Sequence, residues 1–283
     1  MTRPIFLLTD FGTSDTFVGI MKAVILGITP DAPLVDLTHE IPPQNINAGA
    51  FALLTAAPYL PADAVVLAVV DPGVGSARRP IAVQIGGRTF VGPDNGLLSW
   101  PVEALRPRSH TAVILDRPEF WLPNISATFH GRDIFGPVAA HLASGVTLTD
   151  VGSPVDAIQT LPFPTPVSQR DVDGSAASVQ GEVVHVDRFG NLVSNLRAAD
   201  LPERPVVSVA GHTIDGLSPF FQMALGQARN SERLIGLIGS AGLLEIAVPN
   251  GSAASALGCG VGTVVTVTRG PSAALTIQRT PAD

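Results

Sequence analysis

An aspartate, an arginine and a histidine occur in segments whose composition suits catalysis. Asp71 and Arg78 are seven residues apart in a Pro- and Gly-containing segment, and His130 stands between Phe129 and Gly131. Glycine and proline let the backbone turn tightly, so Asp71 and Arg78 could meet across that turn. Histidine is the one side chain whose ordinary pKa lies near neutrality, which makes it the natural general base. For each residue taken singly, a structural ion pair or a structural histidine is the alternative.

A second acidic residue, Asp10, lies in Thr9-Asp10-Phe11-Gly12 at the end of the first predicted strand. Ligands of open α/β sheets bind beyond the carboxyl ends of the strands. A carboxylate at this place could accept two hydrogen bonds from a ribose diol. The alternative is that Asp10 only caps the helix that follows.

Two loop-like segments of the second half could contact a ligand. Asp187, Phe189 and Asn191 share one loop, in which the ring could stack on a base and the polar groups could bond ligand atoms. Turn chemistry would explain the same loop without a ligand. The other segment runs from Ser240 to Val248 and contains glycine. Pro93-Asp94-Asn95-Gly96, by contrast, we interpret as a turn alone.

Strands and helices alternate in the first half, which predicts an α/β domain with a mostly parallel central sheet. We expect strands at Pro4–Thr9, Leu34–Leu37 and Ala64–Val70. Helices are predicted at Asn47–Ala57, at Ile134–Leu142 and around a set of apolar residues spaced by three and four: Phe17, Ile20, Met21, Val24, Ile25 and Ile28.

The second half predicts a smaller all-β domain. Leu161–Ser178 contains three prolines and is interpreted as a linker. Short β-type runs punctuated by Gly and Pro follow it, as in a small barrel or sandwich. We place the domain boundary near residue 165, which divides the chain into 1–165 and 166–283.

The composition excludes several classes of protein. Of 283 residues, 46% are hydrophobic and 14% are charged, which excludes a disordered chain. The net charge of -7 and the absence of a Lys/Arg cluster make nucleic acid an unlikely partner. Ala64–Val70 is the longest apolar run, too short for a membrane span. The sequence begins without the pattern of a signal peptide and contains a lone cysteine, Cys259, which predicts a cytoplasmic globular protein. Its histidines and carboxylates show no metal-ligand spacing, so we expect no metal site.

Together and in this order, the motifs resemble those of the S-adenosyl-L-methionine (SAM) hydroxide adenosyltransferase family, relatives of the fluorinating and chlorinating adenosyltransferases. The resemblance extends from Thr9 to Val267. Its most specific parts are Thr9-Asp10-Phe11-Gly12, Val70-Asp71-Pro72-Gly73-Val74-Gly75, Pro93-Asp94-Asn95-Gly96, Thr128-Phe129-His130-Gly131-Arg132-Asp133 and Asp187-Arg188-Phe189-Gly190-Asn191.

The resemblance implies an enzyme that hydrolyses SAM to adenosine and L-methionine, with SAM as substrate and no cofactor. The family's Asp–Arg–His triad falls on Asp71, Arg78 and His130; the seven-residue offset selects Arg78 over Arg79. Asp10 takes the ribose-binding position in the first domain. The resemblance also implies a homotrimer whose active sites lie between one subunit's first domain and its neighbour's second domain. Further substrate contacts fall on Asp15 and, in the second domain, on Asp187, Phe189, Asn191, Ser240, Glu245 and Val248.

The implied reaction is displacement at C5′ of the ribose, with the methionine thioether leaving. His130 could accept a proton from water, or Arg78 could stabilise a hydroxide, with Asp71 orienting either one. Three other functions remain open. A halide adenosyltransferase would need no base, but an anionic Asp71 would repel the halide. A non-catalytic binder of adenosine or SAM would not need the triad, and a Rossmann-type oxidoreductase would need a glycine fingerprint that the chain lacks.

Overall fold

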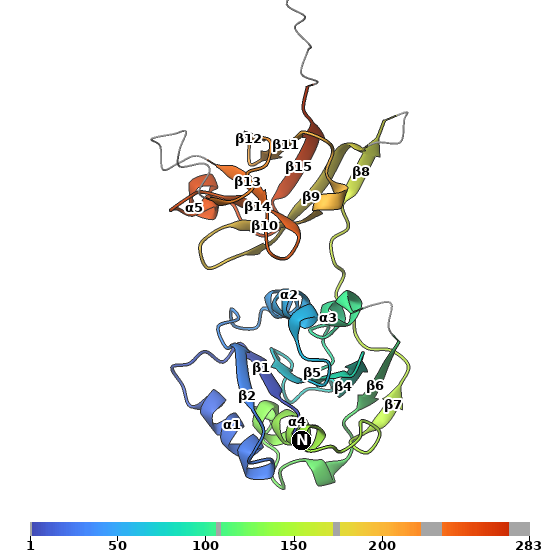
Figure 1. Ribbon diagram of the computed structural model, residues 1–283. Helices are drawn as coiled ribbons and strands as arrows, with labels where there is room; N and C mark the ends of the chain where they lie inside the picture. The colour runs from blue at the N-terminus through green and yellow to red at the C-terminus, as the bar shows by residue number, and fades with distance from the viewer. Residues whose placement is uncertain (1, 106–108, 172–175, 222–233, 272–283) are drawn as a thin grey trace, which may run out of the picture. The chain divides into compact units, whose positions relative to one another are not determined.

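A computed structural model describes residues 2–105, 109–171, 176–221 and 234–271. The chain divides into two compact units, Met1–Phe163 and Pro164–Asp283 (Figure 1). Within the described ranges, no helix is long and apolar enough to cross a membrane.

The first unit is built on a mixed seven-stranded sheet with the order β2-β1-β3-β5-β4-β6-β7. The pairs β2–β1, β1–β3 and β3–β5 are parallel, whereas β5–β4, β4–β6 and β6–β7 are antiparallel. The predicted mostly parallel sheet is therefore correct for one half only. The strands are β1 (Ile5–Thr9), β2 (Leu34–Thr38), β3 (Val65–Val69), β4 (Pro80–Ile85), β5 (Arg88–Pro93), β6 (His110–Ile114) and β7 (Ser153–Val155).

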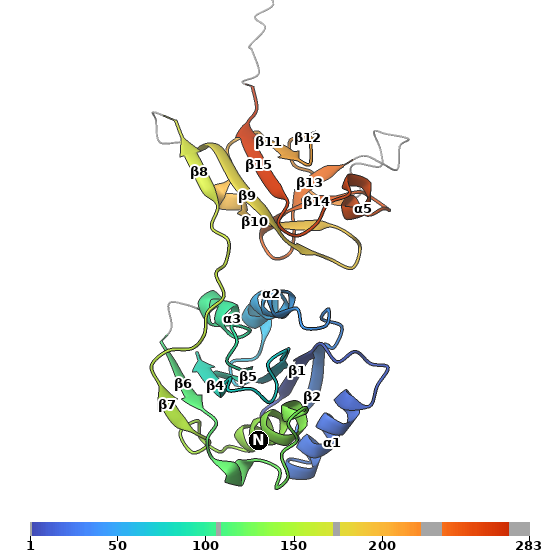
Figure 2. The same ribbon diagram turned by 180° about the vertical axis from the view of Figure 1, so that it is seen from behind.

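Helices cover both faces of this sheet, as the two opposite views show (Figures 1 and 2). One hydrophobic core joins α1 (Phe17–Ile28) and α4 (Gly136–Ala143) to one face of the sheet. A second core joins α2 (Ile46–Ala56) and α3 (Ser99–Ala104) to the other face. Because β3 lies between the two cores, all five of its residues are buried, in agreement with the continuously apolar sequence. Short 3₁₀ turns lie at η1 (Ala57–Tyr59) and η2 (Pro118–Phe120).

Helix α1 buries only part of the predicted apolar set. Val18, Met21 and Ile25 are buried, whereas Phe17 and Ile20 keep 45% and 38% of their surface exposed. The helix is apolar on nearly every side, with Lys22 as its one charged residue, so spacing alone could not select the inner face. One apolar side of α1 is left open.

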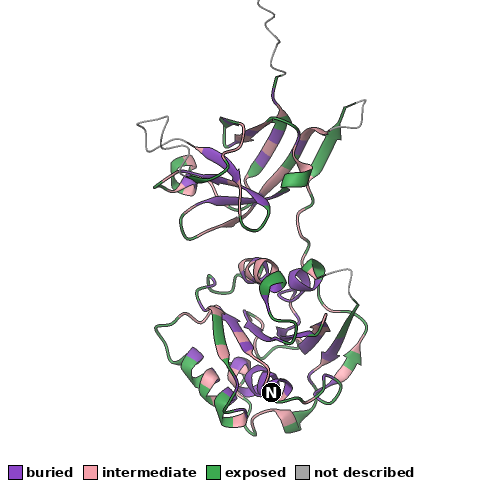
Figure 3. Ribbon diagram, viewed as in Figure 1, coloured by how far each residue is buried: buried purple, intermediate pink, exposed green. Residues whose placement is uncertain are grey.

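In its described residues, the second unit is a sheet of eight antiparallel strands with one short helix, α5 (Ala253–Leu257), around its own buried core (Figure 3). The predicted linker Leu161–Ser178 is too long, because β8 and the first residues of β9 lie within it. The strands are β8 (Val167–Arg170), β9 (Ala176–Val186), β10 (Leu192–Arg197), β11 (Pro205–Val209), β12 (His212–Asp215), β13 (Ile235–Ile238), β14 (Leu243–Ala247) and β15 (Val264–Arg269), with the 3₁₀ turn η4 (Ala198–Asp200) after β10.

Candidate active site

The parallel pairing of β1 and β3 brings two acidic residues to the same edge of the sheet. Thr9 at the end of β1 is paired with Val69 at the end of β3. Asp10 follows Thr9 directly, and Asp71 follows Val69 by two residues. Both carboxylates therefore emerge at the carboxyl end of the parallel strands, where ligands of α/β sheets bind.

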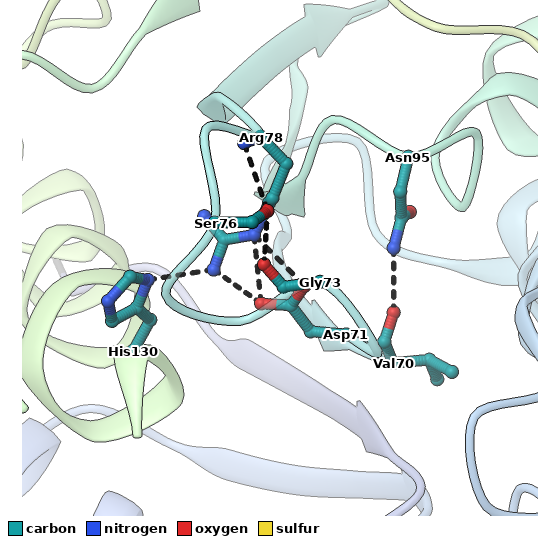
Figure 4. A network of polar contacts seen from close by, with 7 residues as sticks. All are labelled: Val70, Asp71, Gly73, Ser76, Arg78, Asn95 and His130. Atoms are coloured by element: carbon teal, nitrogen blue, oxygen red, sulfur yellow. Dashed lines mark hydrogen bonds and ion pairs between the residues drawn. The ribbon is translucent and has the colours of Figure 1, made fainter. Parts of the chain in front are cut away.

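Asp71 and Arg78 form a buried, two-point ion pair (Figure 4). The Arg78 Nε atom lies 2.9 Å from Oδ1 and 3.0 Å from Oδ2 of Asp71, and the Arg78 Nη2 atom also donates to Oδ2. Only 5% of the Asp71 side chain and 9% of the Arg78 side chain are exposed. A guanidinium and a carboxylate that are removed from water in this geometry hold one another rigidly.

Gly75 allows the loop between these residues to pack against the segment before His130. Its φ of +77° lies in the left-handed region, which favours glycine. A Cβ atom at this position would lie 2.4 Å from the carbonyl oxygen of Ala127. Ser76 closes the same loop by donating its hydroxyl to the carbonyl of Gly73 over 2.6 Å. The backbone of the loop thus approaches residues 126–130 closely enough for the side chains to meet.

His130 completes the arrangement through Nδ1, which lies 2.8 Å from Nη2 of Arg78 (Figure 4). A guanidinium only donates, so Nδ1 is the acceptor and the neutral imidazole carries its proton on Nε2. Burial and the charge of Arg78 lower the pKa of His130, and the carboxylates of Asp71 and Asp133 oppose them only in part. The neutral imidazole is therefore the form that this site favours.

A π-helical turn, η3 (Gly131–Phe135), connects His130 to α4. The N–H of Gly136 reaches back to the carbonyl of Gly131, and a Cβ at Gly136 would lie 2.9 Å from that oxygen. Inside the turn, the fully buried Asp133 accepts a hydrogen bond from the backbone N–H of Ser126 over 2.8 Å. The turn and the loop before it therefore form one supported unit.

Aromatic rings surround the polar groups of the site. The guanidinium of Arg78 lies 5.0 Å above the ring of Phe135, in cation–π range. Phe11, Phe17 and Phe129 form an edge-to-face cluster with ring centroids 5.4 to 6.1 Å apart. Since Phe11 follows Asp10 and Phe129 precedes His130, this cluster forms an apolar wall between the two polar positions.

Asp10 is held by the chain rather than by helix α1. Its Oδ2 atom accepts a hydrogen bond of 2.7 Å from the backbone N–H of Gln44. The N-cap of α1 is Thr16, so the helix-capping alternative for Asp10 is wrong. The Oδ1 atom of Asp10 accepts no hydrogen bond from the described residues and remains available to a ligand. Asp15 is exposed in the loop before α1.

The remaining first-domain motif, Pro93-Asp94-Asn95-Gly96, has a structural role. Arg79 pairs with the buried Asp94 and not with Asp71, so the neighbouring arginines have separate partners. Asp94 also accepts from the N–H of Gln159 over 2.7 Å. Asn95 donates to the carbonyl of Val70 over 2.9 Å, which anchors the segment just before Asp71.

In the second unit, Asp187 organises the turn between β9 and β10. Its Oδ1 atom accepts from the N–H groups of Phe189 and Asn191 over 2.9 and 2.8 Å, and its Oδ2 atom accepts from the Asn191 side chain over 2.8 Å. The turn presents the ring of Phe189 with 75% of its surface exposed. Asp187 and Asn191 therefore shape the loop, and Phe189 is left exposed on it.

The other predicted contacts of the second unit lie along β14. Ser240 is exposed in the turn before it, and Val248 is buried in the core just after it. Glu245 lies over Gly239, where a Cβ would come within 1.7 Å of the carboxylate. Burial and the charge of Asp187 raise the pKa of Glu245, which places these two carboxylates near one another.

The sequence analysis did not single out His39, which the structure places beside Thr9. The Nδ1 atom of His39 lies 2.8 Å from the Thr9 hydroxyl, and both residues are buried. A histidine two residues after the predicted strand Leu34–Leu37 was the available signal. Across the described ranges, no group of three or more His, Cys, Asp or Glu residues is arranged to hold a metal ion.

Models of one protein family match most of the chain. Residues 5–152 match the SAM hydroxide adenosyltransferase N-terminal domain, and residues 181–266 match the C-terminal domain of the same family. These two ranges contain all of the sequence motifs discussed above.

Known proteins agree with the family models. An (R)-S-adenosyl-L-methionine hydrolase of Thermus thermophilus is 42% identical over 90% of this chain and 96% of its own length. A fluorinase of an Actinoplanes species is more distant, at 27% identity over 70% of this chain and 72% of its own. The crystal structure of an uncharacterized conserved protein from Thermotoga maritima superposes with a TM-score of 0.83 at 34% identity, covering 94% of this chain and 100% of that one.

Proposed function

The chain belongs to the SAM hydroxide adenosyltransferase family, and on this premise we propose that it hydrolyses SAM to adenosine and L-methionine at the Asp71–Arg78–His130 site. The observation that carries the assignment to these residues is the continuous contact from the Asp71 carboxylate through Arg78 to Nδ1 of His130. All three side chains lie where the parallel strands end and where α/β folds bind their ligands.

The reaction is an in-line displacement at C5′ of the ribose. A bond forms between the water oxygen and C5′, the C5′–sulfur bond breaks, and its electron pair leaves with the sulfur of methionine. The water loses one proton, which becomes the proton released by the overall hydrolysis. Because a sulfonium leaves readily, the protein has to align and activate the water rather than protonate the leaving group.

Within this proposal, Arg78 stabilises the negative charge that develops on the attacking water, and His130 orients that water. The neutral imidazole has a proton on Nε2, so it can donate a hydrogen bond to the water oxygen while Nδ1 remains bound to Arg78. The positive charge of Arg78 stabilises the negative charge that develops as the water becomes hydroxide-like. Asp71 holds the guanidinium in place from the opposite side. Acceptance of the proton by His130 would require its contact with Arg78 to open.

Substrate recognition is proposed to involve both units. The free Oδ1 atom of Asp10 binds the ribose diol, and the exposed ring of Phe189 stacks on adenine. Asp187 and Asn191 act by shaping the Phe189 loop. The family resemblance makes four further residues substrate contacts: Asp15, Ser240, Glu245 and Val248. SAM is the substrate, and no additional cofactor takes part.

A homotrimer with active sites between subunits is also proposed. Its support in this chain is the open side of α1, where Phe17 and Ile20 are exposed. Phe17 belongs to the aromatic cluster that stands beside Asp10 and His130, so the uncovered apolar surface begins at the active site. Burial of such a surface against a second copy would stabilise the assembly. The cytoplasmic location stays a prediction from the sequence.

Two other functions are tested by the same reaction. A halide adenosyltransferase would need no group that orients water, so it would not require the contact between Arg78 and Nδ1 of His130. A non-catalytic binder of adenosine or SAM would not require the buried pair that Asp71 and Arg78 form.

The test is incubation of the purified protein with SAM in ¹⁸O-water, with and without chloride, followed by mass spectrometry of the nucleosides. The (R) and (S) sulfonium epimers are assayed separately, since the name of the Thermus relative specifies the (R) form. We expect adenosine that carries ¹⁸O at C5′ and forms without halide. A 5′-chloro nucleoside that appears only with chloride would establish the halide transferase instead, and a bound but unreacted substrate would establish the binder.

A further inference from the structure

A buried imidazole lies beneath the turn that presents Asp10. His39 directly follows β2, and only 3% of its side chain is exposed. Its Nδ1 atom lies 2.8 Å from the hydroxyl oxygen of Thr9, which is fully buried. The same hydroxyl oxygen accepts a hydrogen bond from the backbone N–H of Phe11 over 3.2 Å. The imidazole is thus connected, through one hydroxyl, to the residues on both sides of Asp10.

The partners at each end determine the direction of these contacts. On the far side of the imidazole, Nε2 lies 3.0 Å from Oδ1 of Asp36, in ion-pair range but outside hydrogen-bond geometry, and it has no hydrogen-bond partner in the described part of the chain. Burial acts to raise the pKa of Asp36, but its contacts with Lys22 and His39 outweigh burial and the pKa is lowered. Asp36 is therefore an anion that can only accept, so the imidazole proton lies on Nε2. The Thr9 hydroxyl then donates to Nδ1 and keeps a lone pair for Phe11.

Other contacts join the same two loops. The N–H of Gly12 donates to the carbonyl of His39 over 2.8 Å, and the N–H of Gln44 donates to Asp10 over 2.7 Å. Strand β2 also contains one extra residue opposite β1, because Leu7 pairs with Asp36 while Leu8 pairs with Thr38. Such bulges redirect the side chains beyond them and are common next to active sites. Here the bulge precedes His39.

We propose that His39 and Thr9 are positioning residues for Asp10. The Thr9 hydroxyl fixes the backbone of the turn from beneath, and His39, held by Asp36, fixes that hydroxyl. The free Oδ1 atom of Asp10 is thereby aimed at the position of the ribose diol. This inference rests on the proposed function, in which Asp10 binds that diol. A residue that holds a ligand-binding side chain in place before the ligand arrives raises affinity, because less conformational entropy is lost on binding.

The experiment compares Thr9→Val, which removes the hydroxyl at nearly constant shape, with Thr9→Ser, which keeps it. Affinity for adenosine is measured by calorimetry, and kcat and KM are measured for SAM. We expect Thr9→Val to weaken adenosine binding and raise KM about tenfold, the effect of one lost hydrogen bond, with a smaller change in kcat. Thr9→Ser is expected to stay within about twofold of the parent protein, since its hydroxyl can restore the contact.

Asp10→Asn separates this inference from the proposed function. If Asp10→Asn weakens adenosine binding and Thr9→Val does not, the positioning role is overturned while the ribose role of Asp10 stands. If Asp10→Asn leaves binding unchanged, the ribose role itself is overturned, and the positioning role with it. In the double variant we expect no further loss beyond Asp10→Asn, because both changes act on one contact. Fully additive losses would overturn the connection between Thr9 and Asp10.

A second pair of variants covers the case in which Thr9→Val does not fold. Asp36 is half-exposed, so Asp36→Ala removes the support of His39 without opening the core. Asp36→Asn keeps an oxygen acceptor for Nε2 of His39 at the same place. We expect Asp36→Ala to weaken adenosine binding about threefold and Asp36→Asn to restore most of it. Equal affinities of the two variants and the parent protein would overturn the proposal.

Discussion

Nδ1 of His130 accepts a hydrogen bond from Arg78 over 2.8 Å. This contact gives the histidine a defined tautomer, with its proton on Nε2. A histidine in this state orients water by donating to it, whereas proton abstraction would first require Arg78 to withdraw. The relationship between these two residues thus separates two mechanisms that the sequence left open.

Variants of His130 distinguish orientation from proton transfer. Glutamine can donate a hydrogen bond near the place of Nε2 but cannot take up a proton. We expect His130→Ala to lower kcat on the order of 10²-fold or more with a smaller change in KM, because one oriented donor is lost. His130→Gln should recover a large part of that rate. An equal loss in both variants, measured by steady-state kinetics, would assign the proton to His130.

The neighbouring arginines provide a matched pair for a second prediction. Arg78→Lys keeps the charge but loses the two-point contact with Asp71 and the donor to His130. We expect kcat to fall on the order of 10²-fold. Arg79→Lys, whose partner is Asp94, should instead destabilise the fold by roughly 1–3 kcal/mol with kcat unchanged. Kinetics and urea unfolding of both variants check this, and similar kcat values would contradict the separate roles.

Stability should depend on pH through three half-buried histidines, His130, His141 and His185. Burial and the charge of Arg78 lower the pKa of His130 below its ordinary value of 6.5, and burial lowers the pKa of His141 and His185. Below pH 6.5 the unfolded chain therefore binds more protons than the folded one. The stabilisation is complete above this pH and is lost as the pH falls through the folded pKa values. Urea unfolding at pH 8 and pH 5.5 should show lower stability at pH 5.5, and a higher stability there would contradict the assignment.

Two glycines with positive φ allow the effect of backbone strain to be distinguished from the effect of a steric collision, because only Gly75 lies close to another part of the backbone. Gly75→Ala combines a φ of +77° with a collision against the Ala127 carbonyl, whereas Gly145→Ala has a φ of +106° and open space. Both changes should destabilise the fold by about 1 kcal/mol or more. Only Gly75→Ala should also lower kcat, because it moves the Asp71–Arg78 loop away from His130. Equal kcat values of the two variants would show that this approach does not matter for the reaction.

The sequence predicted the parallel half of the sheet well but not its antiparallel half. The buried strand Val65–Val69 follows from its continuous apolar run. Strands β4 and β5 were missed because the signal between them is only Gly86-Gly87. These residues have φ values of +58° and +90°, as in a tight hairpin turn. That turn reverses the chain inside the sheet, so β4 pairs antiparallel with β5, and β6 then pairs antiparallel with β4.

Some features of the candidate site could be predicted from the local sequence, whereas others depend on contacts between residues far apart in the chain. The family resemblance, through its seven-residue offset from Asp71, selected Arg78 over Arg79, and the structure gives these residues different partners. The use of the Asp187 oxygens inside their own turn could not be read from sequence, because a ligand contact and a turn require the same residue types. His39 was missed for a related reason: its partner Thr9 lies 30 positions away and meets it only through strand pairing.

The π-helical turn before α4 has a consequence for how this protein family can change. A π turn holds one residue more than an α turn, so it rotates what precedes it by about 100° relative to the helix that follows. The direction of His130 is thereby independent of the face that α4 buries in the core. Loss or gain of a single residue in this turn would swing the histidine away from Arg78 while the packing of the helix persists. The orientation of the His130 side chain and the packing of α4 can therefore change independently during evolution.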